Sequence, residues 1–183
     1  MTTANKITIG RMILVPVFIV LMLLNFPGHK FAALLVFIVA GASDSVDGYI
    51  ARKYDQITDF GKFADPLADK ILIISALLIF VEWGQMPAWC AIIIVVREFA
   101  VTGLRLIAVE NGTVIAAAWS GKIKTFFSTI GCCVMLTPLA DAMLFGVPAL
   151  SLNNISVALM VILTLWSGCE YFVKNGHVLK STK

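Results

Sequence analysis

Two stretches decide the fold: FAALLVFIVAGASDSVDGYIA at residues 31–51 and FADPLADKILIISALLIFV at residues 63–81. Each is about 20 residues long and mostly apolar, which is what a helix needs to cross a hydrocarbon core of roughly 30 Å. Each also carries two aspartates near the end that adjoins the connecting residues 52–62. These are Asp44 and Asp47 in the first stretch and Asp65 and Asp69 in the second. The pattern predicts two consecutive membrane helices with carboxylates gathered at one end.

The rest of the chain continues this pattern. Of its 183 residues, 60% are hydrophobic and only 14% are charged, so a water-soluble fold could not bury its apolar surface. Turn-forming residues separate six apolar segments, and we expect a single domain over residues 1–183. The fold class is an all-α integral membrane protein with a short interfacial segment at residues 3–8 and six transmembrane helices at Ile9–Phe26, Phe31–Ala51, Phe63–Val81, Met86–Val109, Trp119–Leu139 and Leu150–Phe172.

The basic residues predict the orientation of these helices. Six spans place 13 of the 14 lysines and arginines on one face, and only Lys30 on the other. Because basic residues favour the cytoplasmic side, both termini and the aspartates are expected there. The net charge of +3 then reflects topology and contact with anionic membrane lipids, and we expect no nucleic-acid partner.

The spacing of the aspartates indicates a metal centre. Asp44 and Asp47 are three positions apart, and Asp65 and Asp69 are four apart, so each pair shares one face of a helix. Four carboxylates would repel one another without cations, and oxygen ligands suit hard ions such as Mg²⁺ or Mn²⁺. Two such ions form a clamp for displacement at phosphorus. The alternative is that the aspartates are interface charges paired with nearby basic residues, namely Arg52, Lys53, Lys62 and Lys70.

Small residues accompany the carboxylates. Gly48, Ala51 and Gly61 leave room for a flat base and ribose close to the backbone, and Arg52 could meet a pyrophosphate. The alternative is that they allow close packing between membrane helices.

The whole stretch, Asp44-x-x-Asp47-Gly48-x-x-Ala51-Arg52 followed by Gly61-x-x-x-Asp65-x-x-x-Asp69, resembles the signature of the CDP-alcohol phosphatidyltransferases, and every signature position matches. The resemblance implies the six-helix plan, two divalent cations (Mg²⁺ or Mn²⁺) bound by the four aspartates, and Asp69 as the general base. It also implies CDP binding by Gly48, Ala51, Arg52 and Gly61. The amino-terminal match is shorter and adds Asn5 and Thr8 as nucleotide contacts, although either residue could merely cap the helix.

Three further segments bear on the acceptor alcohol. Arg97-Glu98-Phe99, Thr102-Gly103-Leu104-Arg105 and Gly121-Lys122-Ile123-Lys124-Thr125 resemble segments of bacterial family members whose acceptor is sn-glycerol 3-phosphate. Four cations are therefore expected to bind the acceptor phosphate: Arg97, Arg105, Lys122 and Lys124. The alternatives are that Lys122 and Lys124 anchor the helices at the membrane interface, and that Arg97 is held by Glu98 or another acidic group.

The resemblance therefore implies an enzyme of the bacterial cytoplasmic membrane that makes phosphatidylglycerophosphate and CMP from CDP-diacylglycerol and sn-glycerol 3-phosphate. The resemblance also implies a homodimer. A sibling transferase that uses inositol phosphate, serine or phosphatidylglycerol is the first alternative. A cation transporter is the second, because intramembrane carboxylates also mark ion paths. The acidic groups crowd one face without a relay through the middle, which disfavours transport.

Overall fold

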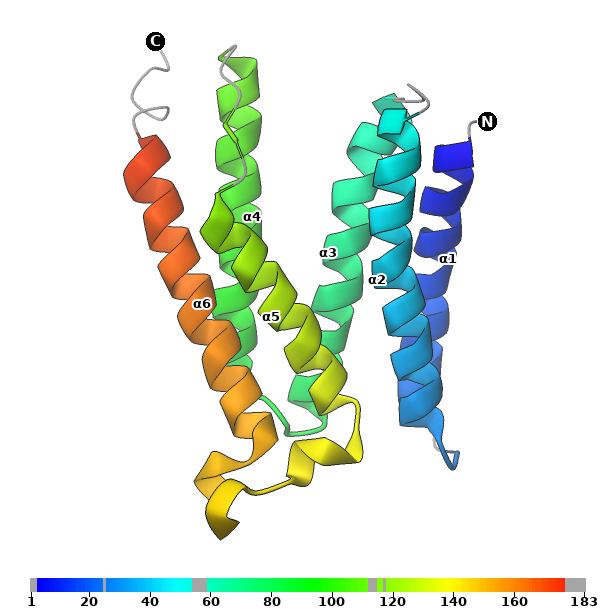
Figure 1. Ribbon diagram of the computed structural model, residues 1–183, viewed down its shortest axis with the longest axis vertical. Helices are drawn as coiled ribbons and strands as arrows, with labels where there is room; N and C mark the ends of the chain where they lie inside the picture. The colour runs from blue at the N-terminus through cyan, green and yellow to red at the C-terminus, as the bar shows by residue number, and fades with distance from the viewer. Residues whose placement is uncertain (1–2, 25, 54–58, 112–114, 117, 177–183) are drawn as a thin grey trace. The chain divides into compact units, whose positions relative to one another are not determined.

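The computed structural model describes the backbone of residues 3–24, 26–53, 59–111, 115–116 and 118–176, and the side chains of these residues except 3–8, 44–53, 59–66, 69, 110 and 145. Within this part of the chain the structure is helical, with no strand beyond an isolated bridge between Met143 and Ser151. The described ranges contain six α-helices, shown in Figure 1: α1 (Thr3–Leu23), α2 (His29–Lys53), α3 (Asp59–Glu82), α4 (Ala88–Glu110), α5 (Trp119–Met135) and α6 (Leu152–Asn175). Each overlaps one predicted span, so the prediction of six helices is confirmed.

The chain divides into two compact units, the first formed by Met1–Phe80 with Leu136–Pro138. In this unit α1 packs against α2, and the rings of Phe18 and Phe37 meet with centroids 5.6 Å apart. Phe18 and Met22, four positions apart, are buried from α1, and Phe37 and Ala40 are buried from α2. Residues three or four apart lie on one face of a helix, so each helix contributes a stripe to this contact.

The second unit comprises Val81–Met135 and Leu139–Lys183, and in it α6 packs against both α4 and α5. Gly131 of α5 faces Met160 of α6 so closely that a Cβ at residue 131 would lie 3.1 Å from the Met160 sulfur. A residue without a side chain thus lets the two helices approach, as is common between membrane helices.

The segment between α5 and α6 corrects one predicted boundary. The fifth span was expected to reach Leu139, but α5 ends at Met135, and the chain continues in short 3-10 helices at Pro138–Asp141, Leu144–Gly146 and Pro148–Leu150. Pro138 explains the early end, because proline has no N–H to donate and disfavours helical backbone in the residue before it. Helix α6 then starts after Ser151, whose Oγ accepts a hydrogen bond of 3.3 Å from the backbone N–H of Asn154.

The interfacial segment expected at residues 3–8 is helical and joined to the first span. Helix α1 is continuous from Thr3 to Leu23, so these residues form its first turns rather than an independent element.

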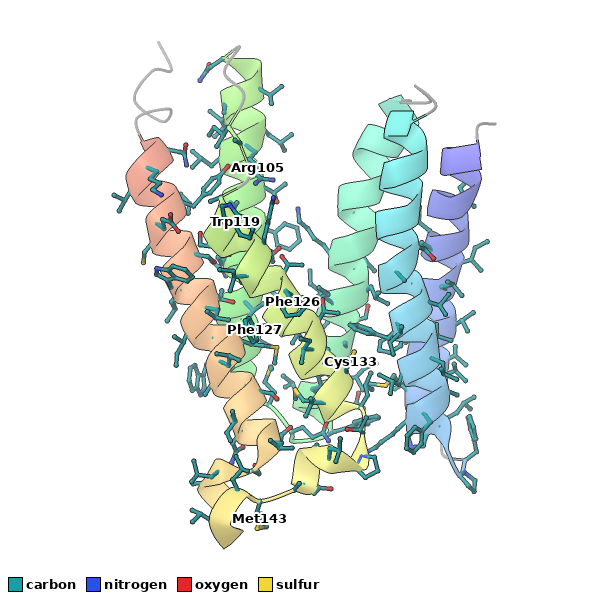
Figure 2. The ribbon with its side chains drawn as sticks, in the orientation of Figure 1. Arg105, Trp119, Phe126, Phe127, Cys133 and Met143 are labelled. Atoms are coloured by element: carbon teal, nitrogen blue, oxygen red, sulfur yellow. The ribbon has the colours of Figure 1, made fainter. Side chains whose placement is uncertain are left out.

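Apolar side chains lie exposed along several helices (Figure 2), including Ile92, Phe99 and Leu106 of α4 and Phe126 of α5. Among the described residues, α6 is long and apolar enough to cross a membrane, and shorter apolar helical stretches lie at Ile9–Leu23 and His29–Ser43. Helix α4 carries Arg97, Glu98 and Arg105 within its apolar sequence. Exposed apolar surface of this extent is typical of helices in contact with lipid.

Candidate functional site

The four aspartates of the predicted metal centre lie on α2 and α3, two consecutive helices of the first unit that run in opposite directions (Figure 1). Asp47 lies six residues before the end of α2, and Asp65 lies six residues after the start of α3. Asp44 lies nine residues before the end of α2, and Asp69 lies ten residues after the start of α3. With a rise of 1.5 Å per residue, the inner pair lies about 9 Å and the outer pair about 14 Å from the helix ends. All four aspartates thus lie within about three turns of the ends of α2 and α3 that the connecting segment joins.

The predicted CDP-binding residues lie on these two helices and on α1. Gly48, Ala51 and Arg52 lie on α2, Gly61 on α3, and Asn5 and Thr8 on α1. The side chains of all these residues, and of the four aspartates, lie outside the described part. Among the side chains that are described, no group of three or more His, Cys, Asp or Glu residues is placed to hold a metal ion.

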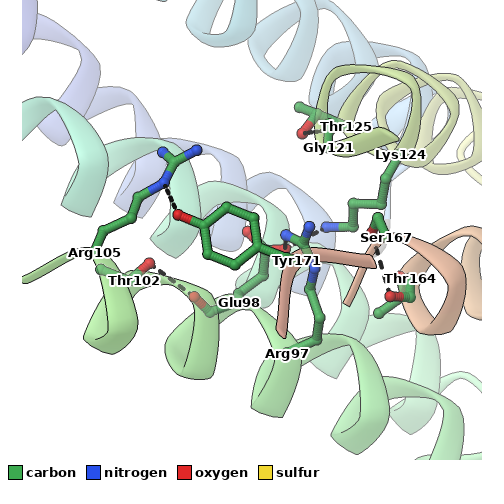
Figure 3. A network of polar contacts seen from close by, with 10 residues as sticks. All are labelled: Arg97, Glu98, Thr102, Arg105, Gly121, Lys124, Thr125, Thr164, Ser167 and Tyr171. Carbon is green, nitrogen blue, oxygen red and sulfur yellow. Dashed lines mark hydrogen bonds and ion pairs between the residues drawn. The ribbon is translucent and has the colours of Figure 1, made fainter. Parts of the chain in front are cut away.

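The second unit contains a charged cluster between α4 and α5 (Figure 3), which we call the Glu98 cluster: Arg97, Glu98 and Lys124. Glu98 Oε1 accepts a hydrogen bond of 2.9 Å from Arg97 Nη1 and one of 2.7 Å from Lys124 Nζ. The side chains are 13%, 20% and 2% exposed for Arg97, Glu98 and Lys124. Two cations and one carboxylate leave the cluster with one net positive charge.

The Arg97 side chain lies against two glycines. A Cβ at Gly168 of α6 would lie 3.2 Å from Arg97 Cγ, and a Cβ at Gly121 of α5 would lie 3.8 Å from Arg97 Nη2. The Nε atom of Arg97 is buried and has no hydrogen-bond partner in the described part of the chain. Arg97 thus occupies space that these glycines leave clear, and it keeps a buried donor that a ligand could satisfy.

The other two predicted acceptor residues have different surroundings. Arg105 Nε donates a hydrogen bond of 3.0 Å to the hydroxyl of Tyr171 on α6, and the guanidinium carbon lies 5.5 Å from the centre of that ring. Lys122 is exposed, with its ammonium 5.1 Å from the centre of the Trp119 ring. A lysine beside a tryptophan is typical of a membrane-interface anchor, which agrees with the alternative interpretation of Lys122.

The surroundings of two other cations bear on the alternatives stated for them. Lys124 is buried and bonded to Glu98, so it is not an exposed anchor. Arg97 is paired with Glu98, as the alternative stated, but Glu98 is shared with Lys124 and cannot neutralise both cations.

Sequence reasoning named Glu98 as an alternative partner of Arg97, but it missed two residues that shape this group, Gly168 and Tyr171. Glu98 had a signal, because a carboxylate beside an arginine inside an apolar segment needs a partner. Gly168 and Tyr171 had none, because both lie more than 60 residues along the chain from the arginines that they contact.

The structure is that of a helical protein with a helix apolar and long enough to cross a membrane. Its partly buried cations are chemically suited to an anionic ligand such as a phosphate. A family model described as CDP-alcohol phosphatidyltransferase matches residues 1–166. The chain belongs to this family of enzymes, and the resemblance inferred from the signature residues is confirmed.

Curated relatives match over nearly the full length. The chain is 41% identical to the CDP-diacylglycerol–glycerol-3-phosphate 3-phosphatidyltransferase of Bacillus subtilis (strain 168), over 97% of each chain. It is 38% identical to a probable phosphatidylglycerophosphate synthase of Mycobacterium tuberculosis (strain H37Rv), over 93% of this chain and 80% of the relative. It is 34% identical to the CDP-diacylglycerol–glycerol-3-phosphate 3-phosphatidyltransferase of Escherichia coli (strain K12), over 90% of each chain.

Proposed function

We propose that this enzyme transfers a phosphatidyl group from CDP-diacylglycerol to sn-glycerol 3-phosphate, giving phosphatidylglycerophosphate and CMP. The names of the relatives support both substrates. The observation that carries the acceptor assignment is the Glu98 cluster, whose net positive charge lies largely shielded from solvent. Such a site suits an acceptor that bears a phosphate, because charge-assisted hydrogen bonds are stronger away from water.

We place the enzyme in the bacterial cytoplasmic membrane as a single six-span domain, with both termini and the active site on the cytoplasmic side. The apolar α6, the exposed apolar side chains and the one-sided distribution of basic residues support this topology. The diacylglycerol chains then stay in lipid while the nucleotide enters from the cytoplasm. We also propose a homodimer, which cross-linking in membranes would test.

The aspartates fit the metal ions that the family resemblance implies. Asp44, Asp47, Asp65 and Asp69 are four carboxylates near the connected ends of two consecutive helices, and carboxylate oxygens are the ligands that Mg²⁺ or Mn²⁺ prefers. When bound, two such ions would neutralise the pyrophosphate and the departing CMP.

The protein's own groups account for the remaining steps. Asp69 accepts the proton of the acceptor hydroxyl, whose oxygen bonds to the phosphorus that bears the diacylglycerol while the bond from that phosphorus to the CMP oxygen breaks. Nucleotide binding is assigned to Gly48, Ala51, Arg52, Gly61, Asn5 and Thr8. The acceptor phosphate is assigned to Arg97, Lys124 and Arg105, whereas Lys122, beside Trp119, is assigned to the membrane interface.

The test measures CMP release by the purified protein in detergent with CDP-diacylglycerol and a panel of acceptors. We expect release that requires sn-glycerol 3-phosphate and Mg²⁺ or Mn²⁺, stops in EDTA and falls at least about 100-fold in Asp69→Asn. Asp141→Asn, in the segment between α5 and α6, is the matched control and should retain full activity. Release with another alcohol alone would keep the family and change the acceptor, and full activity of Asp69→Asn would refute its role as the base.

A further inference from the structure

We propose that Glu98 is a positioning residue of the acceptor site. Its carboxylate holds the Arg97 guanidinium and the Lys124 ammonium beside each other, so that both act on one phosphate group. This inference rests on the proposed function, because it concerns how the phosphate of the acceptor is recognised.

The shared oxygen carries the argument. Arg97 Nη1 and Lys124 Nζ both donate to Glu98 Oε1, so the two nitrogens lie no farther apart than the two bonds combined, about 5.6 Å. Two cations at this distance repel each other, and the repulsion is screened little where side chains are buried. Without the carboxylate, these long side chains from two helices would separate.

The cluster retains the donors that a phosphate needs. A guanidinium carries five N–H donors and an ammonium three, whereas Glu98 Oε1 accepts one from each. Arg97 Nε is buried without a partner in the described part of the chain, and Arg97 Nη2 lies beside Gly121, where no side chain fills the space. A phosphate bound here would satisfy groups that are otherwise costly to bury.

The surroundings make the pair rigid. Lys124 is almost fully buried, and the Arg97 stem lies against Gly168 of α6. The cluster residues come from α4 and α5, and Gly168 of α6 lies against the Arg97 stem (Figure 3), so packing supports the geometry that the carboxylate sets. A preorganised pair of cations binds an anion without first losing the freedom of two long side chains.

Positioning and simple charge neutralisation predict opposite results for Glu98→Gln. If the carboxylate only offset the cations, its removal would raise the net positive charge and lower the KM for sn-glycerol 3-phosphate. If it positions them, the same change lets them separate, and that KM rises. We expect a rise of at least about tenfold, the effect of losing one charge-assisted hydrogen bond.

The experiment measures KM and kcat from CMP release in detergent micelles, for sn-glycerol 3-phosphate and for CDP-diacylglycerol separately. In Glu98→Gln we expect the KM for CDP-diacylglycerol to stay within about twofold of the wild-type value, since the cluster serves the acceptor. Glu170→Gln is the matched control, because Glu170 pairs within α6 with the exposed Lys174 and belongs to no part of the Glu98 cluster. This control should leave both KM values unchanged.

A double-mutant cycle adds a readout that general destabilisation would not produce. In a Lys124→Met background one of the two cations is already absent, so Glu98→Gln should raise the acceptor KM less than it does in the wild type. Glu98→Asp keeps the charge on a shorter side chain and should give an intermediate KM. It also provides the test if Glu98→Gln does not purify as folded protein.

The outcomes separate this inference from the proposed function. The inference would be overturned if the KM for sn-glycerol 3-phosphate were unchanged or lower in both Glu98 variants, or if the KM values for both substrates rose equally. Turnover of sn-glycerol 3-phosphate by the wild type would still uphold the proposed function. If the wild type uses another phosphorylated acceptor, the KM for that acceptor becomes the readout. Turnover of only uncharged alcohols would overturn both.

Discussion

Replacing Gly168 tests whether the placement of Arg97 sets acceptor binding. A Cβ at this buried position of α6 would lie 3.2 Å from Arg97 Cγ, a few tenths of an ångström closer than ordinary contact. Gly168→Ala gains about 1 kcal/mol in helix propensity, which offsets a small displacement of the arginine. We therefore expect nearly unchanged stability and a rise of about threefold in the KM for sn-glycerol 3-phosphate.

Gly168→Leu enlarges the perturbation, because its longer side chain must occupy the space of the Arg97 stem. Overpacking of this kind costs about 1–3 kcal/mol. Displacing Arg97 from Glu98 loses a charge-assisted hydrogen bond worth about 1.5–3 kcal/mol, so the acceptor KM should rise roughly ten- to a hundredfold.

The assay is CMP release with each substrate varied in turn, together with thermal unfolding in the same detergent. Gly41→Leu on α2 is the matched control, because a Cβ at Gly41 meets no atom within 4 Å. An acceptor KM that Gly168→Leu leaves at the wild-type value, in folded protein, would refute the assignment of Arg97 to acceptor binding.

Three further substitutions test the second unit. Tyr171→Phe removes the hydroxyl that accepts from Arg105 but keeps the ring beneath the guanidinium, so the acceptor KM should rise about three- to tenfold; an unchanged KM would exclude Arg105 from the acceptor site. Gly131→Leu places a large side chain against buried Met160 and should lower the free energy of unfolding by about 1–3 kcal/mol, measured by thermal unfolding in detergent. Equal melting temperatures would contradict the close approach of α5 and α6. Ser151→Ala removes the cap of α6 and should cost about 1 kcal/mol in the same assay, whereas no loss would mean that the cap contributes nothing.

The helices were predictable because each coincides with a long apolar run between turn formers, and an unbroken helix satisfies every internal backbone hydrogen bond. The errors fell at element ends, where local chemistry competes with hydropathy. Pro138 ended α5 before its apolar run did, and α1 begins at Thr3, whereas the first span was expected to begin at Ile9.

The site was predictable only in part. The aspartate spacing indicated shared helix faces, and both pairs do lie on helices, but whether they bind metal stays a prediction. The four acceptor cations were proposed as one group. The structure joins Arg97 and Lys124 through Glu98, whereas Arg105 contacts Tyr171 and Lys122 contacts Trp119.

The sequence by itself determined the helical class, the approximate helix bounds and the family, because apolar run length and a fixed residue signature are local properties of the chain. Only the tertiary structure decided which residues meet across helices, such as Gly168 with Arg97 and Tyr171 with Arg105. The physical reason is that a helix apolar on most of its faces has no amphipathic stripe to indicate which side turns inward. Its rotation and its neighbours are set by close packing around glycines and by the need of buried charges for partners.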